Sequence, residues 1–119
     1  MVWVGFSASQ AKFVNGQPKV FESRPRVKWG FCQDCGSTLM WEANLSLFGL
    51  HDMILTELAI GSFDTPEVFR PDRHWQDGQR IQWFDVDDEL PRYKESAVSD
   101  AEPTHWGPFE RTTGKPNSR

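Results

Sequence analysis

The chain has 119 residues, enough for one compact domain and too few for two domains of ordinary size. Its 13 basic and 17 acidic side chains give a net charge of −4, which provides no general attraction to phosphate backbones, so nucleic acid is not an expected partner. No basic region leads into an apolar run at the first residues, and no segment has the apolar length that spans a bilayer. We therefore expect a soluble, cytoplasmic protein without a membrane partner.

The first half of the chain is predicted to form short β-strands, because β-branched and aromatic residues cluster in runs bounded by Gly, Pro and Asn. Asn15 and Gly16 lie between two such runs and predict a hairpin turn, since both residues tolerate positive φ. No window shows a sustained 3.6-residue period, so a mainly β domain is expected. The candidate strands are 3–7, 11–14, 19–23, 27–31, 38–42 and 54–60, the last with an imperfect apolar alternation through Leu55, Glu57 and Ala59.

After residue 60, glycines and prolines recur about every ten residues and predict loops with short strands. Asp64, Thr65 and Pro66 favour a single helical turn, with Asp64 or Thr65 as the cap and Pro66 early in the turn. From residue 94 the chain is polar and rich in Ser, Thr, Pro and Gly. These patterns predict a β domain over residues 1–93 and a polar C-terminal tail over 94–119.

Two further candidate features are a set of tryptophans, spread over both halves of the chain, and a run of acids after residue 60. The tryptophans at positions 29, 41, 75 and 83 either line an apolar pocket or form the core, and the core is the favoured interpretation. The acids Asp85, Asp87, Asp88 and Glu89 either bind a hard cation or form a solvated turn. Because the spacing of a calcium loop is missing, a solvated turn is the favoured interpretation.

Cys32 and Cys35 are the only cysteines and lie between two predicted strands, which is the setting of a zinc knuckle. Two intervening residues let both thiolates face one ion, and Gly36 is free to take a positive φ. A redox site would need the cysteines at the start of a helix, whereas the residues after Gly36 favour a strand. Zinc is therefore favoured over thiol redox chemistry.

Two cysteines supply only half of a tetrahedral zinc site, so two alternatives stay open. In one, the thiols are reduced and carry no metal. In the other, they bind zinc, and the remaining ligands come from a second chain or from a set of side chains elsewhere in this one: His51, Asp52, His74 and His105.

The knuckle and its surroundings resemble a known family. Segment 30–39 (GFCQDCGSTL) is similar to the second zinc motif of the glutathione-dependent formaldehyde-activating enzyme family, which includes centromere-protein-V-like proteins. Residues 13–21 resemble the hairpin that precedes this motif. Residues 61–66 (GSFDTP), 69–71 (FRP) and His74 resemble the segment after the central strand, and 90–93 (LPRY) resembles the closing motif. The resemblance covers roughly residues 3–93 in order.

The resemblance implies a small, β-rich, tent-like fold with two zinc sites, and carbon–sulfur lyase chemistry in which zinc activates the thiol of glutathione toward formaldehyde. In the family, the knuckle cysteines share a structural zinc with a Cys-x-Cys pair nearer the N-terminus, and three more cysteines hold the catalytic zinc. The sequence supplies Cys32 and Cys35 as metal ligands and none of the others. Three accounts follow: an N-terminal truncation, a short protein that has lost catalysis and pairs two chains, or a separate partner chain.

Two functions are therefore weighed. The first is membership of this family with weak or no lyase activity, zinc as the cofactor and glutathione as the co-substrate. The second is a non-catalytic β domain that acts as an oligomeric structural or binding protein. Asp64, Arg73 and His74 lie in the matched segment, but loop capping and surface solvation are the favoured roles. Because an incomplete β domain exposes strand edges, we expect a homodimer.

Overall fold

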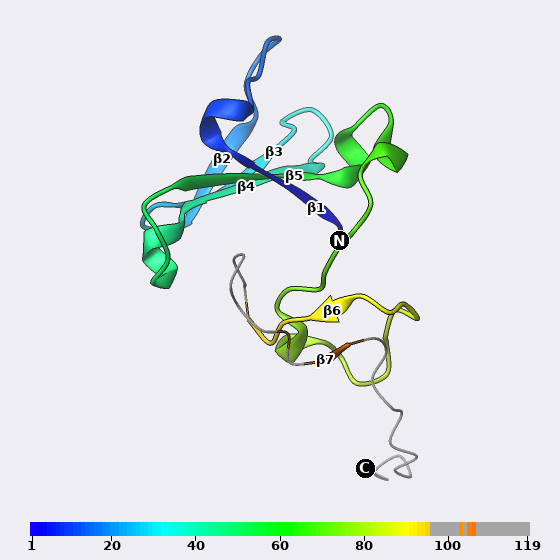
Figure 1. Ribbon diagram of the computed structural model, residues 1–119. Coiled ribbons are helices and arrows are strands. Elements are labelled where there is room, and N and C mark those ends of the chain that lie inside the picture. Colours follow the sequence, from blue (N-terminus) through cyan, green and yellow to red (C-terminus); the bar gives the residue numbers. More distant parts are fainter. Residues whose placement is uncertain (96–102, 104, 107–119) are drawn as a thin grey trace, which may run out of the picture. The chain divides into compact units, whose positions relative to one another are not determined.

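The computed structural model describes residues 1–95, 103 and 105–106. These residues belong to two compact units, Met1–Arg70 and Pro71–Arg119 (Figure 1). The domain boundary that the sequence predicts after residue 93 falls inside the second unit. Most of the polar tail predicted over 94–119 lies outside the described residues.

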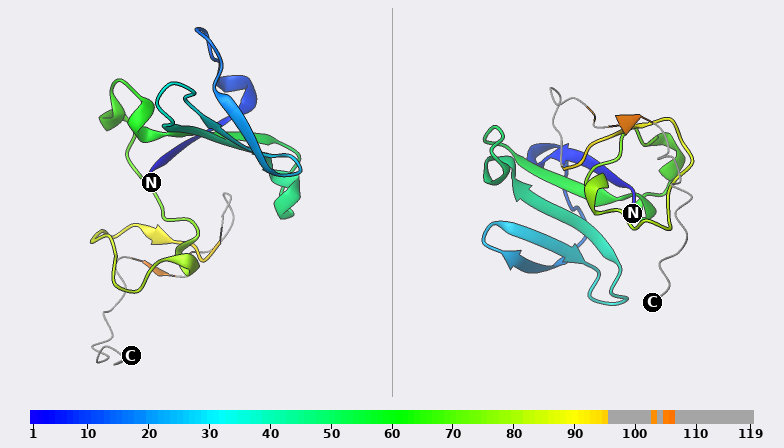
Figure 2. Two further views of the ribbon diagram at one scale, coloured as in Figure 1. Left: turned by 180° about the vertical axis from the view of Figure 1, so that it is seen from behind. Right: turned by 90° about the horizontal axis from the view of Figure 1, so that it is seen from below.

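The first unit is built on a five-stranded antiparallel sheet in which the strands follow the order β1-β5-β4-β3-β2 (Figures 1 and 2). The strands are β1 (Trp3–Ser7), β2 (Lys19–Arg24), β3 (Val27–Phe31), β4 (Thr38–Asn44) and β5 (Ile54–Ala59). No α-helix occurs in the described part of the chain, where the helical segments are short 3₁₀ turns. The prediction of a mainly β fold is confirmed, and the tent-like family fold stays a prediction.

The predicted strand over 11–14 and the predicted hairpin at Asn15 and Gly16 are wrong. The chain leaves β1 through a 3₁₀ turn, η1 (Ala8–Gln10), because the backbone N–H of Ser7 donates to Oε1 of Gln10 at 2.9 Å. Gly16 does adopt the expected positive φ of 82°, but in an irregular connection. The hairpin that contains β2 is closed instead by Pro25 and Arg26, with Arg26 at a φ of 65°.

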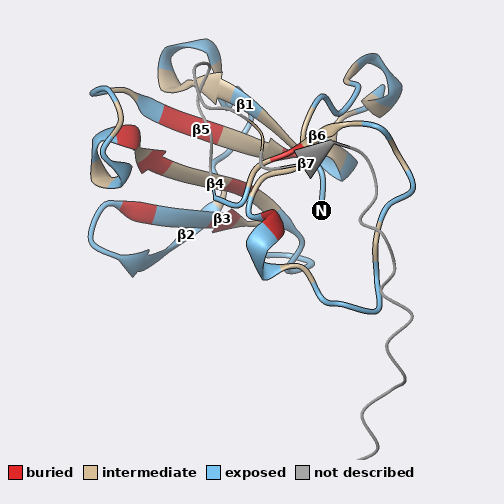
Figure 3. Ribbon diagram, turned by 60° about the horizontal axis from the view of Figure 1, so that its bottom comes forward, coloured by how far each residue is buried: buried red, intermediate tan, exposed pale blue. Residues whose placement is uncertain are grey.

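The core of the first unit is small and aliphatic, and Figure 3 shows its buried positions mainly on β3, β4 and β5. The prediction that the tryptophans form the core is wrong for Trp29, which is 38% exposed, and for Trp83, which is 83% exposed. Trp41 and Trp75 are half-buried. A single sheet with short connections leaves too little enclosed volume for so many large rings. The buried apolar residues are Val27, Met40, Ala43, Leu45, Leu55 and Ala59.

The pairing register divides the side chains of the sheet between two faces, because neighbours along a strand point to opposite sides. The first face, called the tryptophan face below, carries Trp3, Trp29, Trp41 and Glu57. The second, called the phenylalanine face, carries Phe6, Met40 and Leu58.

On the phenylalanine face, aromatic rings from three segments pack together. Phe6 lies 6.5 Å from Phe63 and 6.4 Å from Phe69 between ring centroids, and the latter two are 4.7 Å apart. Phe63 follows the 3₁₀ turn η3 (Ile60–Ser62), and Phe69 follows η4 (Pro66–Val68). The single helical turn predicted at Asp64, Thr65 and Pro66 is thus confirmed as η4, although Thr65 makes no side-chain cap hydrogen bond.

The second unit contains a two-stranded ladder of β6 (Pro91–Arg92) with β7 (His105–Trp106), and His74 forms an isolated bridge to Arg92. A 3₁₀ turn, η5 (Asp77–Gln79), lies between His74 and Arg92 in the sequence. The prediction of loops with short strands after residue 60 is confirmed for the described residues. None of the described helices is long and apolar enough to cross a membrane.

The side chain of Arg92 forms the centre of the second unit and is only 2% exposed. Its Nη1 lies 3.1 Å from Oδ1 of Asp77 and 2.8 Å from Oδ1 of Asp85, and its Nη2 donates to the carbonyl of Val86 at 2.8 Å. Oδ1 of Asp88 lies 3.7 Å from Nη2. Two members of the acidic run are therefore ion-pair partners of a buried guanidinium. The prediction of a solvated turn is wrong for these two residues, Asp85 and Asp88.

Candidate functional site

The two cysteines lie on the turn that joins β3 to β4. The backbone N–H of Cys32 donates to the carbonyl of Ser37 at 2.9 Å, and the N–H of Gly36 donates to the carbonyl of Cys32 at 2.7 Å. Gly36 has a φ of 76°, as the sequence predicts. Thr38 then begins β4 directly, so the cysteines do not precede a helix. The local geometry is that of a knuckle between two strands, as expected.

The thiols are close to one another and to a hydroxyl group. Sγ of Cys35 lies 3.2 Å from Oγ of Ser37. The hydrogen bonds from the side chain and backbone of Ser37, together with one from Cys32, lower the pKa of the Cys35 thiol. Both cysteines are free of disulfide bonds; Cys35 is exposed and Cys32 is half-buried. The pair can therefore present two sulfur ligands to one ion, with deprotonation favoured at Cys35.

Within the described part of the chain, no group of three or more His, Cys, Asp or Glu side chains could hold a metal ion. The candidate additional ligands lie on other segments, and two of them have other partners. Oδ1 of Asp52 accepts a hydrogen bond from Asn44 at 2.6 Å, and His51 is exposed in the same loop. Nε2 of His74 lies 2.8 Å from Oδ2 of Asp88 in the second unit. The side chain of His105 lies outside the described residues.

The other residues of the segment that resembles the family are Arg73, which has structural partners, and Asp64, which is exposed. Arg73 is paired with Asp72, with Nε and Oδ1 at 3.0 Å, and the hydrogen bonds that Arg73 donates to the Asp72 carboxylate raise the pKa of Arg73. Its guanidinium also lies 5.9 Å from the ring centroid of Tyr93. Asp64 is exposed on the loop before η4. These positions agree with the structural roles that the sequence favours.

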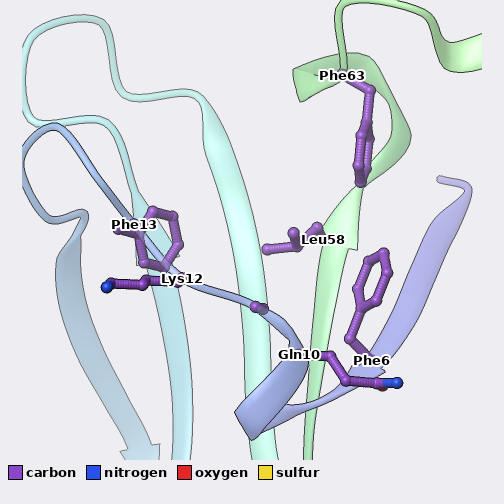
Figure 4. A pocket seen from close by; sticks show the side chains of 7 residues that line it. Phe6, Gln10, Lys12, Phe13, Leu58 and Phe63 are labelled. Atoms are coloured by element: carbon purple, nitrogen blue, oxygen red, sulfur yellow. The ribbon is translucent and has the colours of Figure 1, made fainter.

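A shallow apolar pocket of about 240 Å³ lies on the phenylalanine face between the sheet and the segment after η1 (Figure 4). Its walls are mainly apolar, and Figure 4 shows the amine of Lys12 directed away from Leu58. The described residues that line it include no cluster of acids, bases or nucleophiles. The lining residues are Phe6, Gln10, Ala11, Lys12, Phe13, Leu58 and Phe63.

Glu57 is a feature of the tryptophan face that the sequence interpretation missed. Its strand, β5, is paired on both sides in the sheet, and burial raises the pKa of the Glu57 carboxyl group. The signal was present in the sequence, because Glu57 stands between Leu55 and Ala59 at a position that the alternation assigns to a buried face. Strand propensity alone cannot distinguish a tolerated polar residue from one with a role.

Comparison of the chain with models of protein families, with curated proteins and with solved structures gives no match. The resemblance to the formaldehyde-activating family therefore stays a prediction that rests on the motifs themselves.

Proposed function

We propose that this chain is a β protein of the formaldehyde-activating type in which Cys32 and Cys35 bind zinc in a structural role, with a second copy of the chain completing the site. The role is assembly of a homodimer, and carbon–sulfur lyase activity is weak or lost. The observation that supports this best is the knuckle itself, with two free thiols on one turn and no further ligand cluster in the described part of the chain.

The chemistry of zinc explains why a second chain is the favoured source of ligands. Structural zinc is almost always bound by four ligands in a tetrahedron, and thiolates are among its preferred donors. A twofold axis through the ion would bring two identical knuckles together and supply four sulfurs. The lowered pKa of Cys35 also favours the thiolate form that a metal requires.

The same arrangement explains the weak or lost activity. A catalytic zinc keeps one coordination position open, so that it can lower the pKa of a bound thiol and polarise it toward an electrophile. A four-thiolate site has no open position for the thiol of glutathione. The chain itself then supplies a hydrogen-bonded turn that carries the sulfurs of Cys32 and Cys35.

The metal content of the protein tests the shared site. In chelator-washed protein reloaded with zinc, we expect about half an equivalent of zinc per chain, and native mass spectrometry should give a dimer that carries one ion. Substitution of Cys35→Ser should abolish zinc binding and dissociate the dimer. One equivalent in a monomer would show that the chain completes its own site, and absence of zinc would leave the cysteines without a metal role.

An activity assay separates the structural role from the family's chemistry. We expect the consumption of formaldehyde in the presence of glutathione and zinc to match the uncatalysed rate. A faster, zinc-dependent reaction that disappears in the Cys35→Ser variant would establish the lyase function and contradict the loss of activity.

A further inference from the structure

The pocket on the phenylalanine face has walls from segments that are far apart in the sequence. Figure 4 shows Phe13 on one side of Leu58, and Phe6 and Phe63 on the other. The volume of about 240 Å³ lies below the range of pockets that take drug-sized ligands. A cavity of about 150 Å³ is enough for benzene. The pocket therefore suits a ligand built on a single six-membered ring.

Each wall of the pocket is held by contacts of its own. On one side, the ring of Phe6 packs against that of Phe63, with centroids 6.5 Å apart. On the other side, the segment that carries Phe13 follows η1, where the N–H of Ser7 donates to Oε1 of Gln10 at 2.9 Å. Phe13 is 37% exposed, so part of its ring is in contact with water. A ligand that covers this apolar surface gains from the hydrophobic effect.

The charge at the pocket is positive, because Lys12 is the charged residue among those that line it. Lys12 forms no ion pair or side-chain hydrogen bond within the described part of the chain. It is exposed, and its amine is directed away from Leu58, so the ammonium stays in water at the rim (Figure 4). The other polar side chain of the lining, Gln10, uses its Oε1 on the backbone of Ser7. A ligand therefore meets apolar walls inside and an unpaired cation at the rim.

We propose that this pocket binds a small aromatic carboxylate, with the ring between Phe13 and Phe63 and the carboxylate at the rim beside Lys12. Aromatic rings pack favourably against phenylalanine in offset or edge-to-face arrangements. Because the pocket is shallow, the carboxylate keeps its water and avoids the cost of burying a charge. A cationic head group would be repelled by Lys12, and a neutral one would gain from the apolar contacts alone.

Three ligands of nearly the same shape test the proposal on the full chain at neutral pH: benzoate, benzamide and benzamidinium, which are negative, neutral and positive. We expect benzoate to bind with a dissociation constant of about 1 mM. Benzamide should bind roughly threefold to fivefold more weakly, the range for an exposed ion pair, and benzamidinium more weakly still. The readout is the upfield shift that the ligand ring causes in the methyl resonances of Leu58. Equal affinity of the three ligands, or no shift at Leu58, would overturn the proposal.

Matched variants locate the charge. Lys12→Gln should lower the affinity for benzoate to that for benzamide and leave benzamide binding unchanged, because it removes the cation from the rim. Lys28→Gln is the control, since Lys28 is on the same face of the sheet, in register with Glu22 and Glu42, and does not line the pocket. It removes the same charge and should leave binding unchanged. Equal weakening in both variants would show that only the net charge matters and would contradict the proposal.

Added bulk locates the ring. Ala11 lines the pocket and has an extended backbone with a φ of −111°, which a larger residue also adopts. Ala11→Leu takes up space in the pocket and should abolish benzoate binding while Lys12 stays in place. Asn15→Leu is the control, since Asn15 is exposed in the same connection and does not line the pocket. Loss of binding in both variants, or in neither, would contradict the proposed place of the ring.

Two further arms complete the test. Cyclohexanecarboxylate has the charge of benzoate without its aromatic ring and should bind more weakly, because it lacks the ring–ring contacts. Tighter binding of cyclohexanecarboxylate would overturn the aromatic assignment in favour of an aliphatic acid. Each titration is repeated after zinc chelation and with Cys35→Ser. Benzoate binding should persist there, because every residue that lines the pocket lies outside the cysteine turn, whereas its loss would contradict a pocket within one chain.

Discussion

The knuckle depends on the backbone of one residue. Gly36 adopts a φ of 76°, and a Cβ at this position would meet no atom within 4 Å. The cost of any side chain is therefore backbone strain alone, without a steric clash. The turn therefore requires glycine at position 36 for its backbone conformation and not for lack of space. This conformation keeps Cys32 and Cys35 on the same turn.

Substitution of Gly36→Ala should lower the free energy of unfolding by about 1–2 kcal/mol, because an L-residue pays that cost in the left-handed region. Urea denaturation of the metal-free protein measures it. Gly61→Ala is the control, since Gly61 also has open space around it but no positive φ. A loss at position 36 no larger than that at position 61 would contradict the role of the turn.

Glu57 should make stability depend on pH in an unusual direction for an acid. Because its pKa is raised in the folded state, its favourable contribution is present below the ordinary pKa of a glutamate and is lost as the pH rises through the raised value. Glu57→Gln should therefore raise the melting temperature by a few degrees at pH 7 and leave it unchanged near pH 4. Thermal unfolding at both pH values, compared with Glu42→Gln, checks this, and a gain that is equal at both pH values would contradict it.

At the scale of elements, the strands were predictable where side-chain pattern and local turn chemistry agreed. Runs of β-branched and aromatic residues located β1 to β5, and Gly36 located the turn between β3 and β4. The sheet order was not predictable, because the pairing of β1 with β5 joins segments far apart in the sequence. The error over 11–14 arose because the hydrogen bond from Ser7 to Gln10 ends β1 in a 3₁₀ turn, which strand propensity does not register.

The candidate site was predictable in part for the same reasons. The spacing of Cys32 and Cys35 and the strands beside them gave the knuckle, since those features are local. The tryptophan face was not predictable, because it depends on the register of β3, β4 and β5. Trp29 is an example: its hydrophobicity suggests a place in the core. On β3, next to the edge strand β2 of a single sheet, it is 38% exposed.

The contact between β3 and β4 on the phenylalanine face gives a prediction for an element. A Cβ at Gly30 would collide with Cγ of Met40, its register partner, and would lie 3.0 Å from Sδ. Gly30→Ala should therefore destabilise the sheet by about 1–3 kcal/mol through overpacking. The measurement is chemical denaturation of both single variants and of the double variant with Met40→Ala. The two effects should be less than additive, and strict additivity would contradict the contact.

At the scale of the whole molecule, the two units are stabilised by different interactions. Among the described residues, every buried apolar side chain belongs to the first unit, whereas the buried residues of the second unit are Asp77 and Arg92. In that unit Ile81, Trp83, Phe84 and Val86 are exposed. A buried guanidinium is tolerated because several carboxylates and a carbonyl surround it. The second unit is therefore organised by an ion cluster.

Arg92→Met should unfold the second unit and spare the first. Removing the guanidinium leaves Asp77 and Asp85 close together without their counter-charge, a change that costs roughly 3–5 kcal/mol. The unfolding is measured by hydrogen exchange at two amides. The N–H of His74 donates to the carbonyl of Pro91, and the N–H of Tyr93 donates to the carbonyl of His74, each at 2.9 Å, and both should lose protection. Amides of β4 should keep their protection. Arg73→Met removes a surface pair and should cost less than about 1 kcal/mol; equal effects of the two variants would contradict the ionic centre.

The ion cluster around Arg92 also determines how the second unit responds to temperature. The heat capacity of unfolding rises with the apolar area exposed and falls with the polar area exposed. A unit whose fully buried described residues are a guanidinium and a carboxylate has less buried apolar area to expose than the sheet has. The melting of its described part is therefore expected to add less heat capacity than the melting of the sheet, with a flatter stability curve. Cooling, which weakens an apolar core, has correspondingly less effect on the second unit than on the first.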